Sequence, residues 1–129
     1  MTDPILTPFR AQRNVLLTTY KRDGTPIGTP VHVAVDGDRA YVKTYDKAWK
    51  HKRVRNVPRV LLAPSTFRGR PTGDAVALTG RVLDDDDARR RAQRALAAKY
   101  PVLQGHLIPW AHRWAGYRTI FIELRAGEG

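Results

Sequence analysis

Apolar and polar residues alternate along much of this chain, and turn residues separate the alternating stretches. An alternation of period two, rich in β-branched residues, is typical of a half-buried β-strand. It predicts six strands, at residues 15–20, 26–35, 40–44, 59–63, 75–83 and 117–124. Asp23-Gly24 and Asp36-Gly37-Asp38 lie between the first three strands, and such residues accept the positive φ of hairpin turns. Strands in hairpin order predict a small antiparallel barrel.

Two segments have helical spacing instead. Residues 46–56 place apolar residues on one side of a helix that Pro58 stops. Residues 88–100 form a second helical pattern, which ends at Pro101. The acidic run 84–87 precedes it, and acids at that position complement the helix dipole and cap the first amides. The pattern as a whole predicts a mainly β (α+β) domain with a few helices.

The second predicted strand contains Gly28 and Pro30. Proline cannot donate to a central ladder, and glycine in a strand often marks a bulge or a close approach of the backbone. We therefore expect this strand at an edge of the sheet or at a bulge, where a ligand can approach it.

Composition limits the class of protein. The chain has 129 residues, 42% of them apolar, and no cysteine. This length predicts one domain, 1–129. The lack of cysteine excludes disulfides, thiolate zinc sites and cysteine nucleophiles, and it favours a cytoplasmic protein. No apolar run has the length of a secretory signal or a transmembrane span.

The charge is strongly positive and unevenly distributed. The formal net charge is +11, and residues 43–70 hold nine Lys and Arg against one acid, Asp46. A cationic segment beside strands predicts an anionic partner. Charge alone leaves nucleic acid, a phosphorylated cofactor and an anionic membrane surface open.

The order of motifs within residues 13–83 resembles a known family. VLLTTYKRDGTPIGTPVHV is followed by YVKT, a basic helix and VPRVLLAP. This combination resembles the split β-barrel flavin and deazaflavin oxidoreductases, which include the pyridoxamine phosphate oxidase-like proteins. The most similar branch is that of the small actinobacterial enzymes that use the deazaflavin coenzyme F420. The matching positions are Thr44, Lys50, 58–60 and 68–69.

Two positions depart from the pattern of that branch. Ala48-Trp49 stands where the family has Ser-Gly before its lysine, and His32 stands where the family often has an aromatic residue. Ala48 removes a hydroxyl that could bind a phosphate.

The resemblance implies an FMN-binding type of split barrel and hydride transfer between F420 and a small organic substrate. In such enzymes the cofactor carries the reaction, so no catalytic side chain is expected. The resemblance also implies a homodimer with its pocket at the dimer interface, and neither nucleic acid nor membrane as a partner. No metal site is expected.

The resemblance further implies a set of residues around the cofactor and the substrate. The cofactor-binding residues are Lys50, Thr44, Lys43, Thr29, Pro30, Val31, Arg53 and Arg55, and the substrate-pocket residues are His32 and Trp110.

Each group of these residues has an expected role. Lys50 is a compact cation in the first turn of the predicted helix and is expected at the cofactor phosphate. The Thr44 hydroxyl is expected to donate to a phosphate oxygen. Lys43, Arg53 and Arg55 are expected to bind the phosphate or the glutamate tail of F420. Residues 29–31 are expected to lay their backbone against the ring, and His32 and Trp110 to face the substrate.

Plainer interpretations stay open at this stage. Lys50 could be a solvated lysine on a helix, Thr44 a β-branched strand residue and His32 a partly buried strand histidine. Trp110 could be a core or dimer contact.

The function has alternatives as well. FMN could replace F420 on the same fold, since it also has a ring and a phosphate. A nucleic-acid-binding barrel would place aromatic residues among the cations, and only four are near. A non-catalytic flavin or haem carrier is the remaining alternative.

Overall fold

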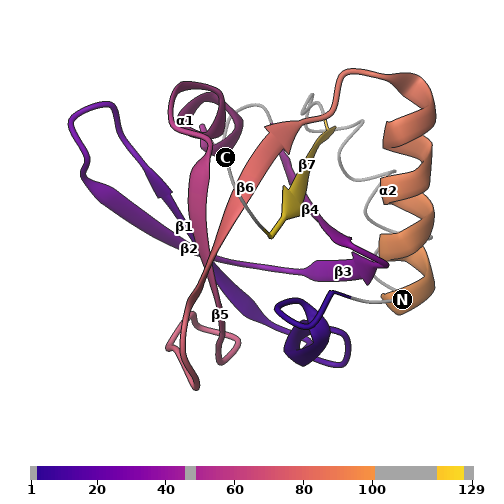
Figure 1. The fold of residues 1–129 in the computed structure, drawn as a ribbon, viewed down its shortest axis with the longest axis horizontal. Helices are drawn as coiled ribbons and strands as arrows, with labels where there is room; N and C mark the ends of the chain where they lie inside the picture. Colours follow the sequence, from indigo (N-terminus) through magenta and orange to yellow (C-terminus); the bar gives the residue numbers. More distant parts are fainter. Residues whose placement is uncertain (1–2, 46–48, 101–118, 127–129) are drawn as a thin grey trace.

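The computed structural model describes residues 3–45, 49–100 and 119–126. Its main feature is a seven-stranded antiparallel sheet that curls into a half-barrel with helices against it (Figure 1). The elements are η1 (Thr7–Phe9), β1 (Val15–Tyr20), β2 (Pro26–Val31), β3 (Val33–Asp36), β4 (Arg39–Tyr45), α1 (Lys50–Asn56), β5 (Arg59–Pro64), β6 (Val76–Val82), α2 (Asp86–Lys99) and β7 (Thr119–Arg125). The predicted mainly β fold class is confirmed.

The strand order β2-β1-β5-β6-β7-β4-β3 places two consecutive strands at opposite edges of the sheet. β2 pairs with β1, so that Val15 lies opposite Val31 and Tyr20 lies opposite Pro26. β3 pairs instead with β4. The single predicted strand 26–35 is therefore wrong. The chain leaves one edge at His32 and joins the other, and we call this point the seam. The prediction that the segment with Gly28 and Pro30 lies at an edge is confirmed.

The inner face of the sheet forms the core of the barrel. Alternate residues of each strand point inward, as in Leu17, Val42 and Ile122, and all three are fully buried. The short helix α1 contacts β1 and β6 and adds Val54 to this core. Gly80 permits that approach, because a Cβ there would lie 3.0 Å from a methyl group of Val54. The local sequence of β6 thus determines how closely α1 packs.

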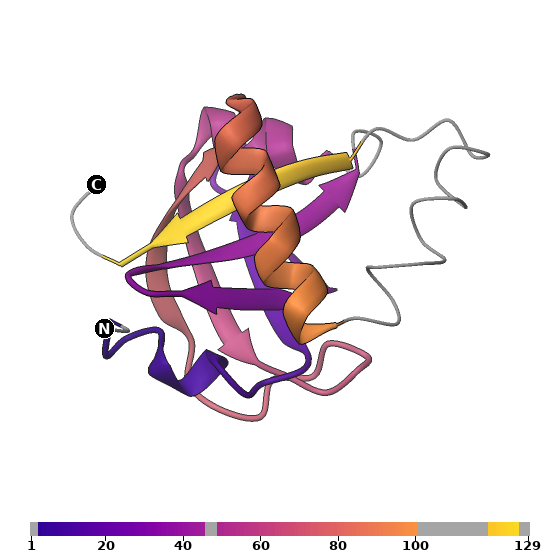
Figure 2. The same ribbon diagram turned by 90° about the vertical axis from the view of Figure 1, so that its right-hand side faces the viewer.

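Helix α2 lies across the outer face of β3, β4 and β7 (Figure 2). Its buried residues Ala92 and Leu96 form a second apolar cluster with Tyr41 of β4 and Phe121 of β7. The helix begins two residues earlier than predicted. Asp85 caps it, because its Oδ2 accepts a hydrogen bond of 2.9 Å from the backbone N–H of Ala88. The acidic run is a helix start, as predicted.

The bounds of most other predicted strands agree closely with the structure. The strands 15–20, 40–44, 59–63 and 75–83 correspond to β1, β4, β5 and β6 within one residue at each end. Two predictions lie partly outside the described residues, the helix 46–56 and the strand 117–124. Within the described residues no helix is long and apolar enough to cross a membrane.

The end of α2 is fastened to the seam by Lys99. Its ammonium donates to the carbonyl oxygens of Phe9 at 3.0 Å, Gln12 at 2.7 Å and Val33 at 2.7 Å. Burial lowers the pKa of Lys99 to about 8, so the side chain is still mainly an ammonium at neutral pH. One side chain therefore joins the N-terminal segment, the start of β3 and α2.

Candidate functional site

A hollow of about 350 Å³ lies at the seam. Its lining residues come from the N-terminal segment, β2, β4 and the β5–β6 loop, and they are Asn14, Pro30, Val31, His32, Lys43, Tyr45 and Phe67. We call it the seam hollow. The four predicted site residues Pro30, Val31, His32 and Lys43 thus meet in one place. They do so because the seam brings the end of β2 beside β4, although four strands separate these two in the sheet order.

The seam hollow combines apolar walls with one cation. Pro30, Val31 and the 79%-exposed Phe67 supply apolar surface. Lys43 is half-buried, and burial lowers its pKa. Burial raises the pKa of Tyr45, which therefore carries a neutral hydroxyl at neutral pH. Such a lining suits a flat, largely apolar ligand that carries a negative charge.

His32 is held in place by Tyr100. The two rings stack with centroids 4.2 Å apart and planes 8° from parallel. The Tyr100 hydroxyl lies 2.8 Å from the carbonyl oxygen of Arg13 and 3.1 Å from that of Val33. Burial lowers the pKa of His32, and the charges of Arg13 and Lys99 lower it further. His32 is therefore a neutral imidazole at neutral pH and can offer an N–H to a ligand.

The lowered pKa of His32 predicts a loss of stability in acid. The unfolded chain binds a proton at His32 near pH 6.5, whereas the folded chain resists it until a lower pH. The wild type should therefore lose more unfolding free energy between pH 7.5 and pH 5 than His32→Phe, which keeps the stacked ring. Urea unfolding at both pH values measures this. Parallel losses in the two proteins would show that His32 is not the group responsible.

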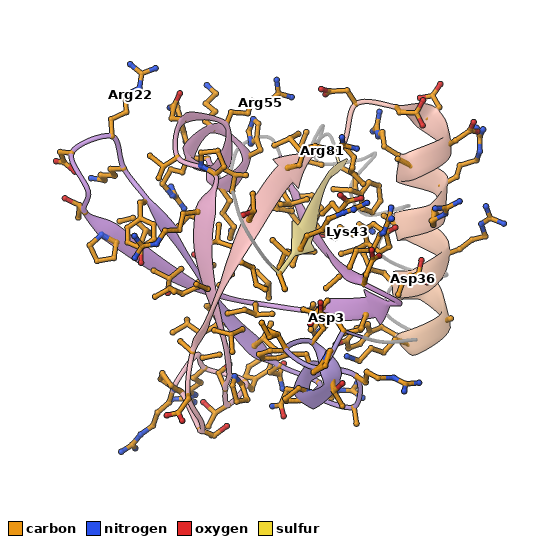
Figure 3. The ribbon with its side chains drawn as sticks, in the orientation of Figure 1. Asp3, Arg22, Asp36, Lys43, Arg55 and Arg81 are labelled. Atoms are coloured by element: carbon orange, nitrogen blue, oxygen red, sulfur yellow. The ribbon has the colours of Figure 1, made fainter. Side chains whose placement is uncertain are left out.

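Lys43 and Thr44 point to opposite sides of β4. Thr44 is buried on the barrel side together with Val42, whereas Lys43 lies on the outer side (Figure 3). Thr29 is also absent from the lining of the seam hollow. The space beside Gly28 is taken by the side chain of Leu16, which would lie 3.3 Å from a Cβ at this position.

Lys50 is the first residue of α1 and is only 8% exposed. Burial lowers its pKa, and the nearby guanidinium of Arg53 lowers it further. Among the described residues, no carboxylate forms an ion pair with it. A buried ammonium beside a second cation is costly unless an anion joins it. This is the electrostatic setting that a phosphate would relieve.

The other two predicted cations of α1 already have partners. The Nε of Arg53 donates to the Thr19 hydroxyl at 2.6 Å. Arg55 forms an exposed ion pair with Asp84, with an N–O distance of 3.1 Å. Their predicted role in binding a cofactor stays a prediction.

Trp49, just before α1, has the left-handed backbone angle φ of 67°. This is the position where the resembling family has glycine, and glycine adopts that conformation without strain. The Trp49 side chain is 58% exposed, and the Lys52 ammonium lies 4.0 Å from the centre of its ring. Trp49 thus adopts a backbone conformation that favours glycine.

The backbone at Trp49 predicts an unusual order of stability between two variants. Trp49→Gly should be more stable than Trp49→Ala by about 1 kcal/mol, because alanine retains the steric cost of a positive φ. Both variants lose the same contact with Lys52, so that contact cancels in the comparison. Chemical unfolding of the pair measures the difference. An alanine variant that is equally or more stable would contradict the left-handed conformation.

One further hollow adjoins the seam hollow, and a third adjoins that one. One, of about 450 Å³, lies between α2 and the strands β4 and β7, and it shares Lys43 with the seam hollow. The next, of about 330 Å³, lies between α1 and the start of α2, and it shares Arg89 and Thr119 with the second. The hollows thus follow one another from His32 to α1 and meet at Lys43, Arg89 and Thr119.

Three lining residues of the seam hollow were not predicted from the sequence: Asn14, Tyr45 and Phe67. Tyr45 follows the YVKT motif, so strand periodicity could have assigned it to the face of Lys43. Nothing local in the sequence indicates the other two. The predicted pocket residue Trp110 lies outside the described residues. Among the described residues, no cluster of side chains could hold a metal ion.

No protein-family model matches the sequence, and no curated protein is significantly similar to it. Solved structures do match along nearly the whole chain. A candidate pyridoxamine 5′-phosphate oxidase from Listeria innocua matches with a TM-score of 0.65 and 15% identity, over 96% of this chain and 91% of that chain. The fold is the pyridoxamine phosphate oxidase-like split barrel.

Two other split barrels show what this fold can accommodate. An F420 reductase matches with a TM-score of 0.65 and 16% identity, over 99% of this chain and 97% of that chain. The haem storage protein of Vibrio cholerae matches with a TM-score of 0.69 and 12% identity, over 100% of this chain and 93% of that chain. The fold therefore occurs both in enzymes and in a storage protein, and function depends on the site.

Proposed function

We propose that this protein is an oxidoreductase that uses coenzyme F420 and acts on a small organic substrate. The observation that carries the proposal is the seam hollow. Pro30, Val31, His32 and Lys43, which the family resemblance assigns to the site, line it together. A volume of about 350 Å³ is within the range of small-molecule sites.

The residues present fit a deazaflavin in their chemistry. The ring would lie against Pro30 and Val31, with the neutral His32 available to donate a hydrogen bond. Lys43 would hold its anionic part at the hollow, and Lys50 of α1 is proposed as a second cation for the phosphate. Thr44 is buried on the opposite side of β4 from Lys43, so its predicted contact with the phosphate is not part of this proposal. When bound, F420 supplies a hydride from its ring, and the protein's part is to orient the reactants and to exclude water.

Dimerisation is part of the proposal. The described residues do not enclose the seam hollow, and the exposed side chain of Phe67 stands in its lining. A second copy of the chain would complete the wall and cover this apolar side chain. Sedimentation at micromolar concentration should show a dimer, and a monomer alone would contradict this part of the proposal.

FMN is the second candidate cofactor, because Pro30, Val31 and the two lysines suit its ring and phosphate equally well. Titration of the protein with each cofactor, followed by the fluorescence of its tryptophans, separates the two. We expect tighter binding of F420 at every salt concentration. Tighter binding of FMN would replace F420 with FMN in this proposal, and a bound haem in the purified protein would favour the carrier alternative.

A further inference from the structure

The second hollow, between α2 and the strands β4 and β7, is cationic on both sides. We call it the α2 groove. It has a volume of about 450 Å³, and its lining residues are Lys43, Asp86, Arg89, Arg90, Gln93, Thr119 and Phe121. Three cations face one carboxylate, Asp86, so the groove has a net positive charge. Phe121 adds an aromatic side chain to this lining.

The α2 groove continues directly from the seam hollow. Lys43 lines both, because it points outward from β4 into the space beside α2 (Figure 3). A ligand with its ring at Pro30 and Val31 would therefore enter the groove past Lys43. Whatever extends from such a ring next meets Arg89 and Arg90.

Helix α2 places the two arginines, and each has one partner among the described residues. The Nη2 of Arg89 donates to the backbone carbonyl oxygen of Thr119 at 3.3 Å, which sets the direction of its guanidinium. Arg90 is exposed and forms an ion pair with Asp87, which precedes it by one turn. A guanidinium has five N–H donors, so each can still bind a carboxylate in the fork geometry that favours it.

The two flanks of α2 differ in whether their residues line the groove. Arg89, Arg90 and Gln93 face the groove, while Arg91 and Arg94 are exposed and lie outside its lining. On α1, Arg53 and Arg55 line neither the seam hollow nor the α2 groove. The cations next to the seam hollow along this surface are therefore those of α2.

We infer that the α2 groove binds the glutamate tail of the coenzyme whose ring occupies the seam hollow. This inference rests on the proposed function and adds a location for the tail. A chain of carboxylates carries several negative charges on a flexible backbone. Paired charge-assisted hydrogen bonds from Arg89 and Arg90 would restrain it beside Lys43. FMN has no such tail, so only its phosphate could contact the cations of this surface.

The test compares two ligands and two matched double variants. The ligands are F420 with several glutamates and the same compound with its glutamate chain removed. Arg89→Gln/Arg90→Gln removes the groove cations. Arg91→Gln/Arg94→Gln removes the same charge from the other flank of α2. Dissociation constants come from fluorescence titration at one low ionic strength, with melting curves as a check on folding.

We expect the wild type to bind the tailed compound about tenfold more tightly than the tail-less one. The groove variant should lose this difference while it binds the tail-less compound as the wild type does. The control variant should keep the difference. If the double groove variant does not fold, Arg90→Gln alone should still lose part of the difference, because its side chain is exposed.

Two outcomes would overturn the inference and leave the proposed function intact. One is equal affinity of the wild type for both compounds, and the other is an equal loss in both double variants. Failure of the wild type to bind either compound would overturn the proposed function, and the groove assignment with it.

Discussion

Lys50→Met is expected to weaken the binding of F420 about tenfold or more, with no loss of stability in the free protein. The ammonium of Lys50 is buried beside Arg53, and burial lowers its pKa. A charged hydrogen bond to a phosphate contributes on the order of 1.5–3 kcal/mol to binding, which corresponds to this loss of affinity. Methionine keeps the apolar stem and removes only the charge. Without a ligand, that change relieves a desolvated cation, so the unfolding free energy should stay the same or rise.

Affinity and stability, measured on the same Lys50 variant, together distinguish a binding role of Lys50 from a structural one. A structural lysine would lower the melting temperature when replaced, whereas a phosphate-binding lysine lowers affinity alone. Lys21→Met, at the exposed turn between β1 and β2, is the matched control and should change neither. Unchanged affinity of Lys50→Met for both F420 and FMN would remove Lys50 from the site.

Lys99→Met is expected to lower the unfolding free energy by about 2–3 kcal/mol at neutral pH. The substitution removes one ammonium that serves the carbonyl oxygens of Phe9, Gln12 and Val33. Those carbonyls belong to the N-terminal segment and to β3, and no apolar side chain can satisfy them. Urea unfolding measures the loss.

The seam gives this substitution a functional consequence. Val33 directly follows His32, and Tyr100, the neighbour of Lys99, stacks on His32. Lys99→Met should therefore also weaken ligand binding at the seam hollow. Arg94→Met, an exposed position on the same helix, is the control and is expected to stay within about 0.5 kcal/mol of the wild type. Equal stability of the two variants would show that the carbonyls find other partners.

Much of the fold could be predicted because strand periodicity and turn residues are local signals. The bounds of β1, β5 and β6 follow from alternation and from the residues that punctuate it. The break at His32 could not be predicted in this way. β2 and β3 are both extended, and the alternation runs through both. Only their pairing partners change, and those partners are distant in the sequence.

The candidate site could be predicted only in part, for a related reason. The family resemblance indicated Pro30, Val31, His32 and Lys43, and they meet at one hollow. Phe67 reaches that hollow from the β5–β6 loop, and no local pattern indicates where a loop will fold. Lys43 and Thr44 are adjacent in the motif, yet the strand directs them to opposite faces. The groove residue Arg89 lies in a helix whose charge pattern is equally typical of a solvated face.

A crystal structure of the protein with F420 tests the central claim most directly. We expect the deazaflavin ring in the seam hollow, with one face against Pro30 and Val31 and its edge near His32. The anionic part should pass Lys43. A ring bound elsewhere on the barrel, with the seam hollow free of ligand, would contradict the account.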